Sequence, residues 1–399
     1  MDAPRTSSPF PGRASVPPPS PSLLRRVGSF WNRVSEGMKL NELWNQLHSD
    51  ARSTYRLYSR EIDAKRAADG HERHHFMRVV KQFFWAILEK LSPARRVVLL
   101  IALALILIPN VSTDDDRGNH RDFHFESRFS GALLMFGLLI LELTDRVVMK
   151  RDLQIAKEIQ AWLLPARPPR IPGLEIAFAT LPANTVAGDY YDVFPRRGFN
   201  APIVGTSNET FMIAVADVAG KSVPAAMLMA TIQASLRTLC TTPGSLTELV
   251  ERMNRYACTN SQNGRRFTTA FIAEYEPASR VLNYVNAGHN APVLRHRSGA
   301  IEELSIGGLP LGVMESATYE CGTVTLELGD LLAAFTDGLV EAENARSEEY
   351  GQARFLSVLQ SNAAAPTEVM LSSVLFDIDR FVGTAPQHDD VTLMLLKSA

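Results

Sequence analysis

Aspartates at the ends of apolar segments are the residues of this sequence best suited to chemistry. Asp189 follows a glycine in "VAGDYYDVFP", Asp217 ends "FMIAVAD", and Asp337 lies near the end of "LLAAFTDGL". Asp389 and Asp390 directly precede the apolar run "VTLMLL". Strand ends that are far apart in the sequence can meet at one edge of a domain. A group of carboxylates away from bulk water is costly unless a cation compensates its charge.

The type of ligand narrows the kind of cation that these residues would bind. Oxygen ligands without histidine or cysteine favour hard divalent ions such as Mg²⁺ or Mn²⁺. Each aspartate also has a purely structural explanation, because Asp is common in turns and beside glycine. The pattern by itself therefore indicates a candidate metal-dependent enzyme and no more.

The composition excludes several other classes of protein. The chain has 399 residues and a formal net charge of −2, so no general excess of basic charge points to nucleic acid. The three cysteines, Cys240, Cys258 and Cys321, show no CxxC spacing. This distribution argues against a disulfide framework or a zinc knuckle and suits a reducing compartment.

The N-terminal part is expected to lack a core of its own. Residues 1–35 are rich in Pro, Ser and Arg and predict a disordered tail without the apolar segment of a secretory signal. Residues 36–94 are predicted to form a cytoplasmic helical segment of mixed charge. Its histidines, His71, His74 and His75, are interpreted as part of an exposed basic helix, because no acidic or cysteine ligand lies nearby.

Two apolar runs at 97–111 and 129–143 predict a two-helix transmembrane hairpin over residues 95–146. Each run is shorter than the roughly 20 residues that span a bilayer. Basic residues flank the pair on the outside, and an excess of acidic residues lies between the runs. This charge distribution is typical of a hairpin with both ends in the cytoplasm. The alternative is a pair of buried helices in a soluble domain.

Residues 147–165 predict an amphipathic linker helix that could form a homodimer. Val148, Ile155 and Trp162 recur every seven residues, and Ile159 occupies the intervening seam position. Prolines end this helix and place the start of the next domain near residue 171.

From 171 to 399 the pattern changes to short strand-like runs that alternate with helical stretches. The helical stretches are 223–239, 245–256, 353–359 and 366–382, and apolar runs such as "LEIAFATLP" and "TTAFIAEYEP" read as strands. This succession predicts an α+β or layered α/β sandwich.

The motifs of this region resemble those of a known family. In order they are "AGDYYDVF", "ADVAGKSVPAAMLMA", "FTTAFIAEY", "VNAGHNAPVL", "GLPLGV", "FTDGLVEAEN" and "HDDVTLMLL". The set is similar to the PPM-type (protein phosphatase 2C-like) serine/threonine phosphatases of the SpoIIE/RsbU branch and covers residues 153–397. The resemblance implies a layered α/β/β/α sandwich of two antiparallel sheets flanked by helices, at residues 171–399.

The resemblance also implies a site with two Mn²⁺ or Mg²⁺ ions. Asp189 would be the bridging ligand, and Asp217 would bind one ion together with the backbone carbonyl of Val218. Asp337 and Asp389 would hold the other ion. Asp390 remains an alternative, because the neighbouring pair of aspartates leaves the register open by one residue.

Other residues of these motifs are given supporting roles. Asp192 is expected to be a supporting carboxylate, and His289 part of a turn near the site. Ser222 stands where the branch usually has glycine, which would cost free energy if that position needs a positive φ.

The implied function is hydrolysis of phosphoserine or phosphothreonine on a regulatory protein through a metal-bridged hydroxide. A STAS-type anti-anti-sigma factor is the expected substrate, and the expected location is the bacterial inner (cytoplasmic) membrane with the phosphatase domain in the cytoplasm. The alternative is a catalytically silent, membrane-bound scaffold that binds a phosphoprotein.

Overall fold

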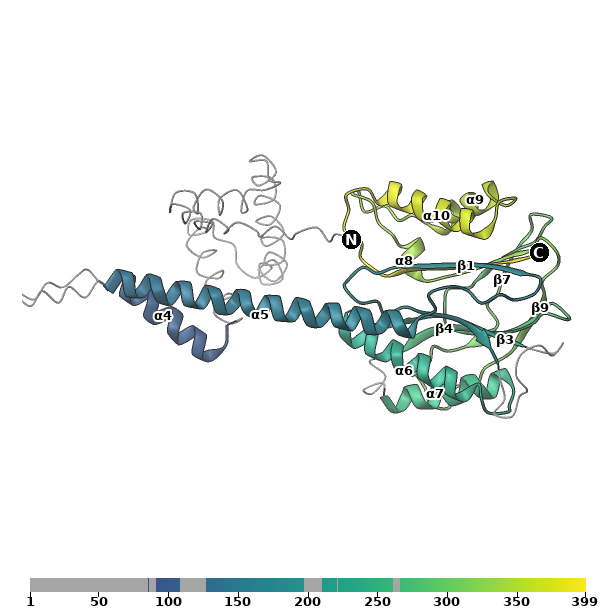
Figure 1. Ribbon diagram of the computed structural model, residues 1–399. Coiled ribbons are helices and arrows are strands. Elements are labelled where there is room, and N and C mark those ends of the chain that lie inside the picture. Colours follow the sequence, from purple (N-terminus) through teal and green to yellow (C-terminus); the bar gives the residue numbers. More distant parts are fainter. Residues whose placement is uncertain (1–84, 86–90, 108–126, 197–209, 221, 261–265) are drawn as a thin grey trace, which may run out of the picture. The chain divides into compact units, whose positions relative to one another are not determined.

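The computed structural model describes residues 85, 91–107, 127–196, 210–220, 222–260 and 266–399 (Figure 1). The predicted tail, most of the 36–94 segment with its three histidines, and the acidic stretch between the apolar runs lie outside these residues. The chain divides into two compact units, with the boundary between Leu139 and Ile140.

The described part of the first apolar run lies in helix α4 (Pro93–Leu107), and the second run lies in α5 (Ser127–Leu163). Helix α4 has 15 residues, and α5 has 37 and continues through the predicted linker helix. Within the described residues, none of the helices combines the length and the apolar character required to cross a membrane.

The second unit contains two β-sheets. The first sheet has the strand order β1-β11-β10-β6-β7, and the second has the order β2-β3-β4-β5-β8, with β9 also pairing with β5. All pairs are antiparallel except β5 with β8. The strands are β1 Leu174–Leu181, β2 Tyr190–Pro195, β3 Phe211–Val218, β4 Thr268–Glu276, β5 Val281–Ala287, β6 Val293–Arg295, β7 Ile301–Glu303, β8 Gly307–Gly308, β9 Gly322–Thr325, β10 Leu331–Phe335 and β11 Val391–Ser398.

Helices cover the outer face of each sheet (Figure 1). Helices α6 (Val223–Leu239) and α7 (Leu246–Asn260) pack on the second sheet, and α9 (Gln352–Ser361) and α10 (Thr367–Val382) pack on the first. The short helix α8 (Asp337–Val340) follows β10. The predicted α/β/β/α sandwich of the α+β class is therefore confirmed.

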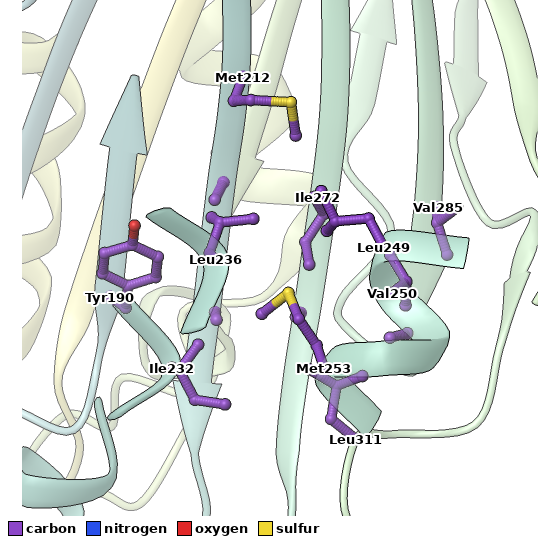
Figure 2. Close-up of a cluster of buried hydrophobic side chains, with 14 of the residues drawn as sticks. Tyr190, Met212, Ile232, Leu236, Leu249, Val250, Met253, Ile272, Val285 and Leu311 are labelled. Carbon is purple, nitrogen blue, oxygen red and sulfur yellow. The ribbon is translucent and has the colours of Figure 1, made fainter. Parts of the chain in front are cut away.

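The alternation of side chains along the strands creates the layers. In β3, Ile213 and Val215 are buried against the first sheet, whereas Met212 and Ala214 are buried on the opposite face beneath α6 and α7. This is the two-residue period of a strand that is covered on both sides. Figure 2 shows the outer cluster, in which Met212 lies among side chains of α6 and α7 such as Leu236.

One ion pair between a buried carboxylate and a partly exposed guanidinium ties the second sheet to its covering helix. Arg237 on α6 donates from Nε to one oxygen of Asp192 on β2 at 2.8 Å and from Nη2 to the other at 2.9 Å. The hydroxyl of Tyr190 donates to the same carboxylate at 2.8 Å, and Asp192 is 0% exposed. The guanidinium also stacks on the ring of Phe194. Asp192 therefore has a structural role, as expected from the sequence.

We expect Arg237→Met to lower the free energy of unfolding by about 2 to 3 kcal/mol, because it leaves the buried Asp192 carboxylate without its cation. Urea unfolding followed by circular dichroism measures this change. The double variant with Asp192→Asn removes the orphaned charge and should recover part of the loss. Equal stability of the single and double variants would contradict this account.

Candidate metal centre

The antiparallel register of each sheet brings two of the predicted aspartates together. In the second sheet, Tyr190 pairs with Ala216, so Asp189 and Asp217 are the next residues on neighbouring strands. In the first sheet, Asp337 begins α8 directly beyond the end of β10, and Asp389 lies just before β11, which pairs with β10. The four aspartates thus come from the ends of four elements.

Carboxylates from the two sheets interact electrostatically and raise one another's pKa. Burial, followed by the charges of Asp337 and Asp389, raises the pKa of Asp217 from 3.8 to about 7. Asp189 is 2% exposed, and burial followed by the charge of Asp217 raises its pKa well above 3.8. The four aspartates that the sequence singled out therefore influence one another electrostatically in the folded chain.

Two glycines permit the close approaches on which this arrangement depends. A Cβ atom at Gly188 would lie 3.2 Å from the Cβ of Ala225 and 3.3 Å from the carbonyl oxygen of Val218. The Val218 carbonyl therefore lies directly beside the residue that precedes Asp189. A Cβ atom at Gly338 would collide with the backbone carbonyl of Asp390, so only glycine lets the first turn of α8 pack against the start of β11.

The structure separates the roles of the neighbouring Asp389 and Asp390. Asp390 accepts the backbone N–H of Ala183 at 2.7 Å through Oδ1 and that of Gly188 at 2.6 Å through Oδ2. Both of its oxygens are thus engaged in holding the segment that leads to Asp189. Asp389 is half-buried, and it raises the pKa of Asp217 more than Asp390 does. The geometry favours Asp389 as the ligand and Asp390 as an anchor for the loop.

Further residues that the sequence did not single out contact this centre. The hydroxyls of Thr336 and Thr392 donate to Oδ2 of Asp189 at 2.9 and 2.6 Å. Gln160 near the end of α5 is buried and bonds twice to Ala187, donating to its carbonyl at 2.7 Å and accepting its N–H at 3.0 Å. Both threonines lie inside recognised motifs, but Gln160 has no signal beyond its place in the linker helix.

His289 and Ser222 occupy unusual environments near these residues. Burial lowers the pKa of His289 to about 4, so its ring is neutral near pH 7. Its Nδ1 pairs with the hydroxyl of Thr269 at 2.9 Å, which supports a structural role. Ser222, just before α6, has φ 65° and ψ −151°, a region that is otherwise used almost only by glycine. The predicted backbone cost of a serine at this position is therefore present.

The predicted ligands carry oxygen donors, which suit a hard divalent cation, although their side chains do not form a closed metal site. Among the described residues, no three His, Cys, Asp or Glu side chains form a cluster that could hold a metal ion as they stand. The charged groups that shift the pKa of Asp189 and Asp217 most are nevertheless all carboxylates. With the carbonyl of Val218 alongside, the donors are oxygen atoms only, which suits Mg²⁺ or Mn²⁺.

Comparisons with known proteins agree with the motifs. Residues 207–398 match the family described as Stage II sporulation protein E (SpoIIE). Phosphoserine phosphatase RsbU of Bacillus subtilis is 27% identical over 252 residues, which cover 62% of this chain and 70% of RsbU. Protein IcfG of Synechocystis sp. is 25% identical over 285 residues, which cover 64% of this chain and 43% of IcfG. The chain thus spans less than half the length of IcfG.

A solved structure supports the fold independently. The SiaA-PP2C domain of Pseudomonas aeruginosa has a TM-score of 0.54 and 19% sequence identity, and the match covers 63% of this chain and 98% of that domain. At this level of identity, the likeness establishes the shared fold alone.

The raised pKa of Asp217 predicts how the stability of the chelator-treated protein depends on pH. Because the folded state binds this proton more tightly than the unfolded state, stability falls as pH rises from 3.8 to about 7. Asp217→Asn should therefore flatten the pH dependence in this window and be more stable than the wild type at pH 8. Urea unfolding at a series of pH values in EDTA measures both effects.

Asp377 provides a control of opposite sign. Hydrogen bonds from Arg354 lower its pKa, so its contribution is present above pH 3.8 and is lost as the pH falls further. Asp377→Asn should reduce stability at pH 8. If both variants changed stability in the same direction at pH 8, the electrostatic interpretation of Asp217 would be wrong.

Proposed function

We propose that the protein is a metal-dependent phosphatase that hydrolyses phosphoserine or phosphothreonine on a regulatory protein, because residues 207–398 match the SpoIIE family. The observation that carries this proposal is the electrostatic interaction of Asp217 with Asp189 in its own sheet and with Asp337 and Asp389 in the other. Such a concentration of negative charge is suited to bound cations and unsuited to binding a phosphate group without them.

Each residue then has a defined task. Asp189, Asp217, Asp337 and Asp389 supply carboxylate oxygens to two Mn²⁺ or Mg²⁺ ions, and Val218 supplies its backbone carbonyl. When bound, the cations lower the pKa of coordinated water and neutralise charge on the phosphoryl group. The burial of Asp189 limits its access to bulk water, and Asp390 holds the loop that positions it.

A cavity of about 250 Å³ is lined in part by Asp389. Its walls combine apolar side chains such as Val391 with acidic ones such as Glu343. The similarity to RsbU, which is named a phosphoserine phosphatase, supports phosphoserine as the group that is hydrolysed. A STAS-type protein is our specific proposal for the regulatory protein.

The second candidate function is a scaffold that binds a phosphoprotein without hydrolysing it. It is favoured by the positions of the acidic side chains, because no three of them form a closed metal site in the described residues. It is disfavoured by the presence of all four expected carboxylates, since a scaffold gains nothing from their mutual repulsion.

Asp337→Asn distinguishes the two functions. In the full chain with Mn²⁺, the variant should release phosphate from p-nitrophenyl phosphate and from a phosphoserine protein at least about 100-fold more slowly, because a metal ligand stabilises several kcal/mol of transition-state charge. The exposed Glu320→Gln is the control and should match the wild type. If the wild type released no phosphate with Mn²⁺ or Mg²⁺ and did not differ from Asp337→Asn, the scaffold function would be favoured.

We further propose that the linker helix regulates the phosphatase as a homodimer. The seam residues Val148, Ile155, Ile159 and Trp162 are 51%, 45%, 48% and 82% exposed, so the predicted apolar seam is available to a second chain. At the end of the same helix, Gln160 holds Ala187, two residues before Asp189. A rearrangement of the helix pair would thereby reach the candidate metal centre.

A location in the bacterial inner (cytoplasmic) membrane is also proposed, with the phosphatase domain in the cytoplasm and the apolar residues of α4 and the start of α5 meeting the lipid. The apolar runs and their basic flanks support it. Membrane fractionation of cells that express the full chain tests it, and recovery of the protein only in the soluble fraction would refute it.

Two linker variants separate dimerisation from coupling to the site. Ile155→Glu is expected to shift the full chain towards monomers in analytical ultracentrifugation. Gln160→Ala is expected to keep the dimer but to lower metal-dependent phosphate release about tenfold, because two buried backbone groups of Ala187 lose their partners. Glu158→Ala, an exposed change on the same helix, is the control. Unchanged activity of Gln160→Ala would remove the basis for this coupling.

A further inference from the structure

Asp189 is held by two threonines that come from the opposite sheet. Thr336 directly follows β10 and Thr392 lies near the start of β11, whereas Asp189 directly precedes β2 in the second sheet. Both hydroxyls donate to the same oxygen, Oδ2, at 2.9 Å from Thr336 and 2.6 Å from Thr392. Both threonines are 0% exposed. The contact is therefore a buried bridge between the sheets at the candidate metal centre.

The backbone determines where these hydroxyls lie. The N–H of Thr336 donates to the carbonyl of Thr392 at 3.1 Å, and the N–H of Thr392 donates to the hydroxyl oxygen of Thr336 at 2.9 Å. The Thr336 hydroxyl thus accepts one hydrogen bond and directs its proton to Asp189. The hydroxyls of Thr392 and Thr180 are 2.9 Å apart, so Thr180 can donate to Thr392 while Thr392 donates to Asp189.

The two threonine hydrogen bonds reach only one of the two carboxylate oxygens of Asp189. Oδ2 receives both threonine protons, whereas Oδ1 receives neither. The carboxylate is also fixed against rotation, because turning it would leave two buried hydroxyls without their acceptor.

We propose that Thr336 and Thr392 are positioning residues that fix the Asp189 carboxylate and leave Oδ1 as its oxygen for a divalent cation. This inference rests on the proposed metal-dependent function and extends it. Groups that hydrogen-bond a ligating side chain hold its orientation, and their loss typically weakens metal binding about 10- to 100-fold. The threonines act through Asp189 and do not themselves contact the substrate.

Two pairs of variants of the full chain test the proposal. Thr392→Val keeps the shape of the side chain but removes the hydroxyl, and Thr392→Ser keeps the hydroxyl but removes the methyl group. After treatment with EDTA and removal of the chelator, Mn²⁺ binding is measured by isothermal titration calorimetry, and the melting temperature is measured without metal. Thr336→Val and Thr336→Ser are the second pair. Thr323→Val is the matched control, because Thr323 is exposed and its hydroxyl donates to Asn283 rather than to Asp189.

The expected result is an Mn²⁺ affinity about 10-fold or more weaker for each valine variant and within about threefold of the wild type for each serine variant. Thr323→Val should bind Mn²⁺ like the wild type. Wild-type affinity in both valine variants, or an equal loss in the valine and serine variants, would overturn the proposal. If the wild type itself bound no Mn²⁺, the proposed function would fail first, and the two failures are therefore distinct.

Discussion

The repulsion between carboxylates at the meeting point of two sheets is the constraint on which this domain depends. Burial of Asp189 and the charges around Asp217 both disfavour ionisation, and the sandwich keeps them together only because extensive strand pairing holds the elements in place. A core built for stability alone would not retain such a group. The cost is understandable if cations complete the site, since they convert the repulsion into binding free energy.

Three buried aspartates of this domain differ in the groups that compensate their negative charge. Asp192 is neutralised by the guanidinium of Arg237, and Asp390 is satisfied by two backbone N–H groups. Asp189 instead accepts hydrogen bonds from two hydroxyls and lies beside the acidic Asp217 and Asp390. The first two arrangements stabilise the fold, whereas the third leaves negative charge to be compensated by something else. This difference in partners, more than burial, separates structural from functional carboxylates.

The candidate centre also connects layers that are distant in the chain. Asp189 is held through Thr392 by the first sheet, and its approach loop is held through Asp390 by the same sheet and through Gln160 by the linker helix. A short chain of buried polar contacts therefore connects the linker helix outside the sandwich to the carboxylates inside it. A site built in this way responds to movement of any of these elements, which gives the proposed regulation a physical route.

The sequence by itself determined the elements and the candidate ligands, because both are local patterns. Short apolar runs predicted the strands, the predicted helical stretch at 223–239 is α6, and Asp189, Asp217 and Asp389 lie at or beside strand ends, whereas Asp337 begins α8. It could not separate Asp389 from Asp390, nor find the roles of Thr392 or Gln160. Thr392 meets Asp189 across 203 residues, and such contacts depend on the register and packing of two sheets. Only the tertiary structure determines these contacts, because a local sequence pattern does not specify which strand ends will lie beside each other.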